Sequence, residues 1–250
     1  AGAWQPDGGR IDRNAADESY VGEQFTDDLI ILAGEQAQPP ILVGASMGGL
    51  FAMLAESRWP GLFRAMVLVD ITPRWEQAGL QRILAFMTAF PDGFDSLDHA
   101  GEVIAAYQPQ RRKRKSAEEL RELLREGPDQ RWRWHWDARL IDDLVRDSAR
   151  HQDDIANAAR TLGCPVLLIS GGRSDLVSAD TVEEFQSLVP HARHVHLPQA
   201  THMLAGDDND TFTRTMLQYL AELPAASATS ANLSTTGDSA VTTPDTGASA

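Results

Sequence analysis

The feature that most constrains the fold is an alternation of short apolar runs with longer amphipathic segments. Four β-rich runs end in turn or polar residues: Ile41–Val43, Ala65–Asp70, Pro165–Ser170 and Ala192–Leu197. Segments with helical periodicity separate or flank them: Met47–Arg58, Asp180–Leu188, Thr211–Leu223, and an earlier one around Phe25, Leu29 and Leu32. The uniformly apolar Ile41–Val43 is typical of a strand buried on both faces, as in parallel sheets. Strands that alternate with helices predict an α/β fold with a mostly parallel sheet.

The composition is that of an ordinary globular protein, and it limits the partners that we expect. Hydrophobic residues make up 42% of the 250 residues and charged residues 23%. No apolar run approaches the ~20 residues that span a bilayer. The formal net charge of −14 opposes binding to nucleic acid or to anionic membranes. The N-terminus shows no secretory signal, and the single cysteine, Cys164, cannot form an internal disulfide, so we expect a cytoplasmic protein in which Cys164 is a small buried residue.

The segment from Pro73 to Arg160 interrupts the alternation. It contains no convincing strand, and its pattern predicts an all-helical cap, residues 73–160, over the active face of a core formed by residues 1–72 and 161–223. Trp132, Trp134 and Trp136 would not share one face of a helix, so they either pack the cap or line a substrate pocket. The basic run 111–115 is interpreted as a solvated helix end rather than a nucleic-acid patch. Residues 224–250 lack Lys, Arg and aromatic residues, which predicts a disordered tail.

A serine stands where the first predicted strand turns into a helix, within "ILVGASMGGLFAM". Ser46 lies between Gly44 and Gly48 and fits the pattern Gly-x-Ser-x-Gly, in which a tight strand-turn-helix projects the serine oxygen outward. Glycine is expected on both sides because a Cβ there would collide with the neighbouring strand or helix. The N–H of Met47, at the start of the helix, is expected to donate to an anionic oxygen. The motif predicts a nucleophilic serine with half of an oxyanion hole.

An acid and a histidine follow this serine, each after a predicted strand. Asp175 comes after a buried strand and a glycine turn, and His202 follows the last strand. The chain order serine, aspartate, histidine is that of a nucleophile, its orienting acid and its general base. Taken alone, Asp175 could be a turn or cap residue and His202 a loop histidine. Asp70, at the end of the strand after Ser46, is the rival for the acid role.

Three histidines near the last predicted strand also raise the question of a metal-binding site. These three, His191, His194 and His196, lie in or directly before that strand and have no carboxylate or cysteine at ligand spacing. We interpret them as alternating side chains of a surface strand. No metal and no organic cofactor is therefore expected.

Together, "PPILVGASMGGL", "VLVDITPR", "WHWDARL", "PVLLISGGRSDLVS" and "HMLAGDDNDTFT" resemble the α/β-hydrolase family, in its esterase, epoxide-hydrolase-like and cofactor-free haloperoxidase-like branch. The resemblance runs from about Pro6 to Leu223. It implies a nucleophile at Ser46, an acid at Asp175, a base at His202 and an oxyanion donor at Met47. It also implies that residues 73–160 form the cap.

The identity of the nucleophile, a serine at position 46, limits the class of reaction that the resemblance implies. Family members that attack a saturated carbon use a carboxylate, because water can reopen the resulting ester. A serine instead favours acyl transfer to and from a small ester-like substrate through an acyl-enzyme.

The resemblance further implies that the family's first strands and its second oxyanion donor are missing from this sequence. The strand at Ile41–Val43 would then be an exposed sheet edge through which copies of the chain could associate. The alternative to a working serine hydrolase is a truncated homologue that binds a ligand or partner without turnover.

Overall fold

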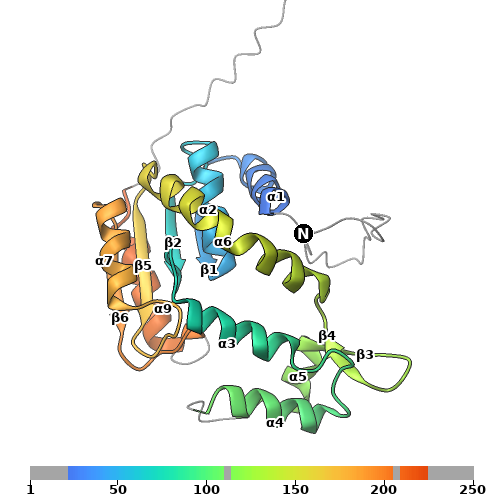
Figure 1. Cartoon of the computed structure of the whole chain (residues 1–250). Coiled ribbons are helices and arrows are strands. Elements are labelled where there is room, and N and C mark those ends of the chain that lie inside the picture. The colour runs from blue at the N-terminus through green and yellow to red at the C-terminus, as the bar shows by residue number, and fades with distance from the viewer. Residues whose placement is uncertain (1–21, 110–113, 205–208, 225–250) are drawn as a thin grey trace, which may run out of the picture.

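A four-stranded parallel sheet forms the centre of the protein (Figure 1). The computed structural model describes residues 22–109, 114–204 and 209–224. The strands are β1 (Ile41–Ala45), β2 (Ala65–Val69), β5 (Val166–Gly171) and β6 (Arg193–Leu197), and they lie side by side in the order β1-β2-β5-β6. All three pairings are parallel. The predicted α/β fold with a mostly parallel sheet is confirmed.

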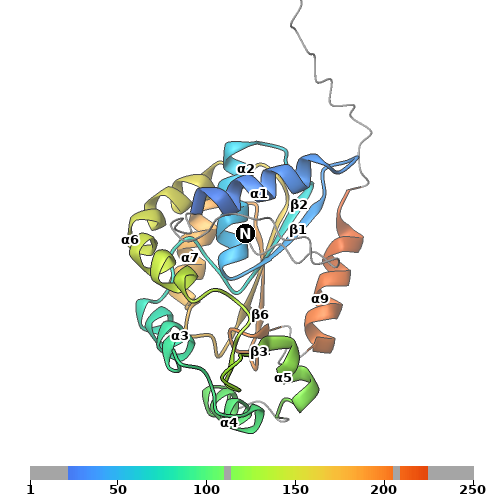
Figure 2. The same cartoon turned by 90° about the vertical axis from the view of Figure 1, so that its right-hand side faces the viewer.

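Helices cover both faces of this sheet (Figure 2). On one face lie α2 (Met47–Arg58), α6 (Arg139–Arg160) and α7 (Ala179–Leu188), with α1 (Gly22–Gly34) against α2. On the other face lies α9 (Asn209–Glu222). Met66 and Leu68 of β2 join the apolar cluster under α2 and α6, whereas Val67 and Val69 join the cluster under α9. Alternate side chains of one strand therefore fill two separate cores, which requires a strand that is apolar throughout.

Burial differs between the centre and the edges of the sheet. Every residue of β2 and β5 is buried, as expected for central parallel strands. In β1 the pattern is looser, and Val43 is 50% exposed. The expected burial of Ile41–Val43 on both faces is wrong, because β1 has a single neighbour, β2, in the part of the chain that the structure describes.

A second, smaller unit lies beyond the carboxyl ends of the strands; we call it the cap segment, residues 77–136 (Figure 1). It contains α3 (Gln77–Thr88), α4 (Leu97–Tyr107), α5 (Ala117–Leu123) and an antiparallel pair, β3 (Leu124–Glu126) with β4 (Trp132–Trp134). Phe94, Leu120 and Leu124 lie at the centre of its own apolar cluster. The expected all-helical cap is wrong, since the alternating tryptophans belong to a strand and the turn after it.

The expected cap range, 73–160, is divided between two hydrophobic clusters. Ile155 and Ala159, near the end of α6, lie in the main core beside α2 rather than with the cap segment. Residues 1–21 of the expected core and all of the expected disordered tail, 224–250, except its first residue lie outside the described residues.

Candidate active site

The turn between β1 and α2 holds Ser46 in a strained conformation. Its backbone has φ 49° and ψ −127°, in the left-handed half of the φ range that non-glycine residues seldom adopt. The Ser46 N–H donates to the carbonyl of Val69 over 3.1 Å, which ties the turn to the end of β2. This is the conformation that the Gly-x-Ser-x-Gly pattern predicts.

The glycines around Ser46 differ in how closely they approach neighbouring atoms, and the pattern is not the one expected. A Cβ on Gly44 would lie 2.8 Å from Cα of Gly49, and a Cβ on Gly49 would lie 2.6 Å from Ile71 Cγ2. A Cβ on Gly48 would meet nothing within 4 Å. The expected collision at Gly48 is therefore wrong, because the helix packs on the strand through Gly49, one position later.

The first turn of α2 begins beside Ser46 and leaves the amides of Met47 and Gly48 without an acceptor among the described residues. The N–H groups of Gly49 and Leu50 donate to the Ser46 carbonyl over 2.9 and 3.4 Å. The Met47 N–H has no acceptor among the described residues. A free N–H at the positive end of a helix can stabilise negative charge on a nearby oxygen.

Asp70, at the end of β2, is the acid that contacts His202. Its side chain has no solvent exposure, and its Oδ2 lies 2.8 Å from Nδ1 of His202. Oδ2 also accepts from Ser174 Oγ over 2.5 Å, and Oδ1 accepts from the Gly171 N–H over 2.8 Å. Asp70 has φ 50°, so two neighbouring strands, β1 and β2, are each followed by a non-glycine residue at positive φ. The carboxylate is held by donors from β5 and the loop after it.

Asp175 does not contact His202, contrary to the expected pairing. Its Oδ2 lies 3.0 Å from a guanidinium nitrogen of Arg82 on α3. The helix packs closely here, since a Cβ on Gly79 would lie 1.8 Å from the Asp175 carbonyl oxygen, and the Glu76 N–H donates to the Leu176 carbonyl over 3.0 Å. Because α3 covers this loop and supplies Arg82, the Asp175 carboxylate pairs with the cap segment, and Asp70 occupies the place beside the histidine.

His202 is the link between the strand ends and the cavity. Its side chain is 15% exposed, and the bond from Nδ1 to Asp70 leaves Nε2 free to accept a proton. No hydrogen bond joins Ser46 Oγ to His202 in the described part of the chain. The structure thus brings Asp70 and His202 together and leaves Ser46 at the neighbouring strand end.

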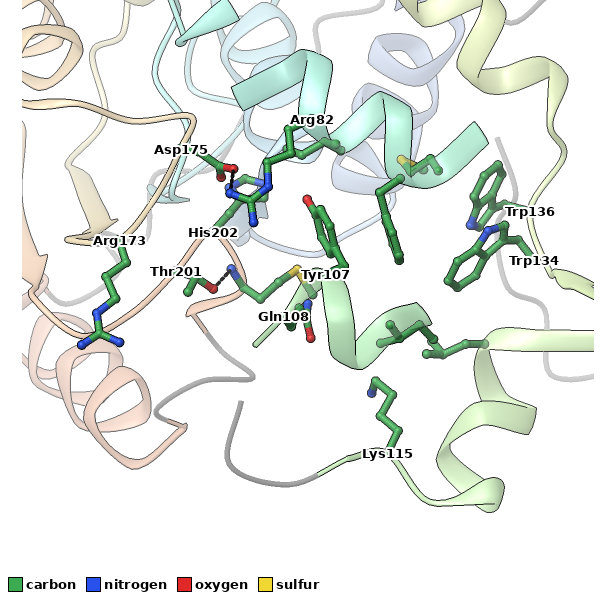
Figure 3. A pocket seen from close by; sticks show the side chains of 16 residues that line it. Arg82, Tyr107, Gln108, Lys115, Trp134, Trp136, Arg173, Asp175, Thr201 and His202 are labelled. Carbon is green, nitrogen blue, oxygen red and sulfur yellow. Dashed lines mark hydrogen bonds and ion pairs between the residues drawn. The ribbon is translucent and has the colours of Figure 1, made fainter. Parts of the chain in front are cut away.

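A cavity of about 530 Å³ lies between these strand ends and the cap segment (Figure 3). Its wall includes His202 and Asp175 from the core, Phe86 from α3, and Trp134 and Trp136. The two tryptophan rings stack with centroids 5.9 Å apart. Ser46 is not part of this wall. Of the two roles left open for the tryptophans, Trp134 and Trp136 line a pocket.

Tyr107 also lines the cavity, and its hydroxyl is poorly solvated. Burial raises the pKa of Tyr107, and the negative charge of Asp175 raises it further. The hydroxyl therefore stays protonated at neutral pH and can serve as a hydrogen-bond donor in the cavity wall.

The remaining titratable candidates have partners within the protein. His194 Nε2 and His196 Nδ1 both face Ser170 Oγ, at 2.8 and 3.3 Å, and His191 Nε2 faces the Cys164 carbonyl at 3.0 Å. Cys164 is buried, and burial raises the pKa of its thiol to about 12. The expected small buried cysteine is confirmed.

Comparison with known proteins identifies the fold's relatives. The model of the alpha/beta hydrolase family matches residues 5–215. A 3-hydroxybutyrate-oligomer hydrolase of Cupriavidus necator is 24% identical over 206 residues, 78% of this chain and 70% of that protein. Esterase Rv0045c of Mycobacterium tuberculosis is 30% identical over 167 residues, 62% of this chain and 52% of that protein. The chain thus spans between about half and 70% of the length of these two relatives.

Solved structures give the same result for the fold. The crystal structure of E-2-(acetamidomethylene)succinate hydrolase superposes with a TM-score of 0.69 at 24% identity, covering 82% of this chain and 75% of that one. None of the described helices has the length and apolar character needed to cross a membrane. The family model covers most of the sequence and the sheet matches, so the chain belongs to the alpha/beta hydrolase family.

Proposed function

We propose that this chain is a serine hydrolase that cleaves small ester-like substrates through an acyl-enzyme, with Ser46, His202 and Asp70 as its catalytic triad. The observation that carries the proposal is the buried hydrogen bond of 2.8 Å between Asp70 and His202, one strand away from the strained Ser46. A buried carboxylate bonded to Nδ1 fixes the tautomer whose Nε2 is a base.

The reaction follows from these positions. Ser46 Oγ attacks the substrate carbonyl carbon while His202 Nε2 takes its proton, and Asp70 stabilises the imidazolium that forms. The Met47 N–H donates to the oxyanion. Collapse of the intermediate breaks the bond to the alcohol, which receives the proton from His202. Water, deprotonated by His202, then attacks the acyl-enzyme and releases the acid and free Ser46.

Asp70 is preferred to Asp175 as the acid for two reasons. Asp70 touches His202, whereas Asp175 is committed to Arg82. Asp70 is also fully buried and held by Ser174 and Gly171, so its orientation is fixed before substrate binds. The ester-like substrate class is supported by the names of two relatives, a 3-hydroxybutyrate-oligomer hydrolase and an esterase.

The second candidate function is ligand binding without turnover. It is favoured by the cavity wall, which includes His202 but not Ser46, and by the missing hydrogen bond between these two residues in the described structure. Under this alternative, the cavity binds a small molecule and no acyl-enzyme forms.

Labelling with a fluorophosphonate distinguishes the two functions. The triad predicts rapid modification of Ser46 that is lost in Ser46→Ala and in His202→Ala, because only a base-activated serine attacks phosphorus quickly. Ser170→Ala is the matched control, since Ser170 is a buried serine that also touches a histidine, His194. Equal labelling of wild type and His202→Ala removes the triad. A folded wild type that takes no label supports the binding function.

A further inference from the structure

The described wall of the cavity is mostly apolar, and its charged side chains are mostly positive. Its wall is mostly aliphatic and aromatic, with Ile83, Phe86, Ile104 and Trp134 among its members. Among the described residues of this wall, three are cations, Arg82, Lys115 and Arg173, and one is an acid, Asp175. This excess of positive charge lies within a chain whose formal net charge is −14. The local charge of the cavity is therefore opposite to that of the whole chain.

Two of these cations already have partners. Arg82 forms its ion pair with Asp175 at 3.0 Å, and its guanidinium lies 5.5 Å from the centre of the Tyr107 ring. Arg173 donates to the side-chain oxygen of Gln199, and Figure 3 shows its guanidinium turned away from the other labelled side chains. Each of these two arginines therefore already has one N–H donor engaged within the protein, and the charge of Arg82 is offset by Asp175.

Lys115 is the exception. It is half-buried, and it has no ion pair or hydrogen bond with any described residue. In Figure 3 it lies across the cavity from His202, with its ammonium group toward the other labelled residues. A charged ammonium beside apolar walls loses part of its hydration, so an anionic ligand group there gains more than it would in water.

We infer from this arrangement that the cavity selects acyl groups whose apolar segment ends in an anionic group, bound by Lys115 while the scissile carbonyl lies at the His202 end. The inference rests on the proposed hydrolase function and adds its substrate class. The reaction is the hydrolysis of a half-ester, in which water adds to the carbonyl carbon, the ester C–O bond breaks, and a dicarboxylate and an alcohol are released. The acyl group is transferred to Ser46 in the first step and from Ser46 to water in the second, and it occupies the cavity in both, so a contact with its far end acts throughout.

The test compares p-nitrophenyl half-esters of four- to eight-carbon dicarboxylic acids with p-nitrophenyl alkanoates of the same chain length. A charge-assisted contact predicts a preference of about 10–100-fold in kcat/KM for the half-ester at the best length. Lys115→Met, which replaces lysine with an unbranched apolar side chain of similar length and removes the charge, is expected to abolish this preference, and Lys115→Arg to keep part of it.

Arg114→Met is the matched control, since Arg114 is exposed and does not line the cavity. Equal ratios in wild type and Lys115→Met overturn the inference, and so does a wild type that hydrolyses both series without preference. If no ester is hydrolysed, the proposed function fails on its own. Calorimetry on Ser46→Ala with monomethyl and dimethyl adipate then still tests the inference, which requires tighter binding of the monoester, and loss of that difference in the Lys115→Met double variant.

Discussion

The strand ends and the cap segment lie on opposite sides of the cavity, and different interactions hold each of them in place. Ser46 and Asp70 follow strands that belong to the main core, and both are held at positive φ by backbone and side-chain bonds to neighbouring strands. The cap segment has a small cluster of its own and is tied by half-exposed ion pairs such as Arg131–Asp95 and Arg133–Asp129, at 2.5 and 2.6 Å. Exposed pairs of this kind contribute little stability.

This difference assigns separate tasks to the two regions. A strained residue persists only where the surrounding structure determines its position, which suits the packed sheet to the proposed reacting groups. The cap segment supplies most of the apolar cavity wall and Lys115, which under our proposal select the substrate and need no strain. Changes at the strand ends should therefore alter the chemical step, and changes in the cap segment should alter substrate choice.

The largest effect is expected where the sheet meets α2. Gly44→Ala places a Cβ 2.8 Å from the backbone of Gly49, so the turn that holds Ser46 must shift. A displacement of about 1 Å at a reacting group costs roughly 10²-fold in rate, and we expect fluorophosphonate labelling to slow by about that factor. Gly48→Ala, where the added Cβ meets nothing within 4 Å, should stay within a few-fold of wild type. Similar rates for the two variants would show that the close approach of strand and helix does not position Ser46.

A smaller effect is expected at the junction between the two regions. Gly79→Ala places a Cβ 1.8 Å from the Asp175 carbonyl oxygen, so α3 must move away from the core. Overpacking of this kind costs about 1–3 kcal/mol, measured as the free energy of unfolding in urea. Gly101→Ala, whose nearest neighbour is the flexible end of Leu120 at 3.3 Å, is the control within the cap segment and should cost less. The reverse order would place the rigid contact inside the cap segment instead.

The smallest effect is a pH dependence at β6, away from the cavity. Burial lowers the pKa of His194, and the charge of His196 lowers it further. Below its ordinary value of 6.5 the unfolded chain therefore binds more protons than the folded one, so this histidine's contribution to stability falls as pH drops below about 7.

Urea unfolding between pH 7.5 and 5.5 measures this dependence. His194→Gln should flatten it, whereas Ser170→Ala, which removes the hydroxyl partner but no titrating group, should retain it. An unchanged slope in His194→Gln would contradict this origin of the acid sensitivity.

Local patterns were enough to predict the sheet and the helices packed on it. The expected helix Met47–Arg58 matches α2, and the expected strand Ala65–Asp70 differs from β2 by one residue. Both are encoded by side-chain periodicity within a dozen positions. The β3–β4 pair was missed because it is short and lies between helices, although the alternation of Trp132, Trp134 and Trp136 has the period of a strand.

The sequence left open which acid pairs with His202, and the expected pairing with Asp175 differs from the structure. Asp70 and Asp175 each follow a buried strand, and the sequence contains no local signal for which of them faces His202. That choice depends on how α3 covers the loop after β5, with Gly79 against the Asp175 backbone and Arg82 beside its carboxylate. Ser174, which donates to Asp70, was also missed, since its role appears only when β2 and the loop after β5 lie together.

The most direct test of the central claim is the rate of acylation by p-nitrophenyl acetate in Asp70→Asn and Asp175→Asn, normalised to folded protein by circular dichroism. An amide at the position of the orienting acid favours the wrong histidine tautomer and lowers the rate by about 10⁴ in a serine protease. We predict a loss approaching that size for Asp70→Asn and no more than a few-fold loss for Asp175→Asn, which breaks the pair with Arg82. A large loss in Asp175→Asn with near-normal acylation in Asp70→Asn would contradict the assignment of Asp70 as the catalytic acid.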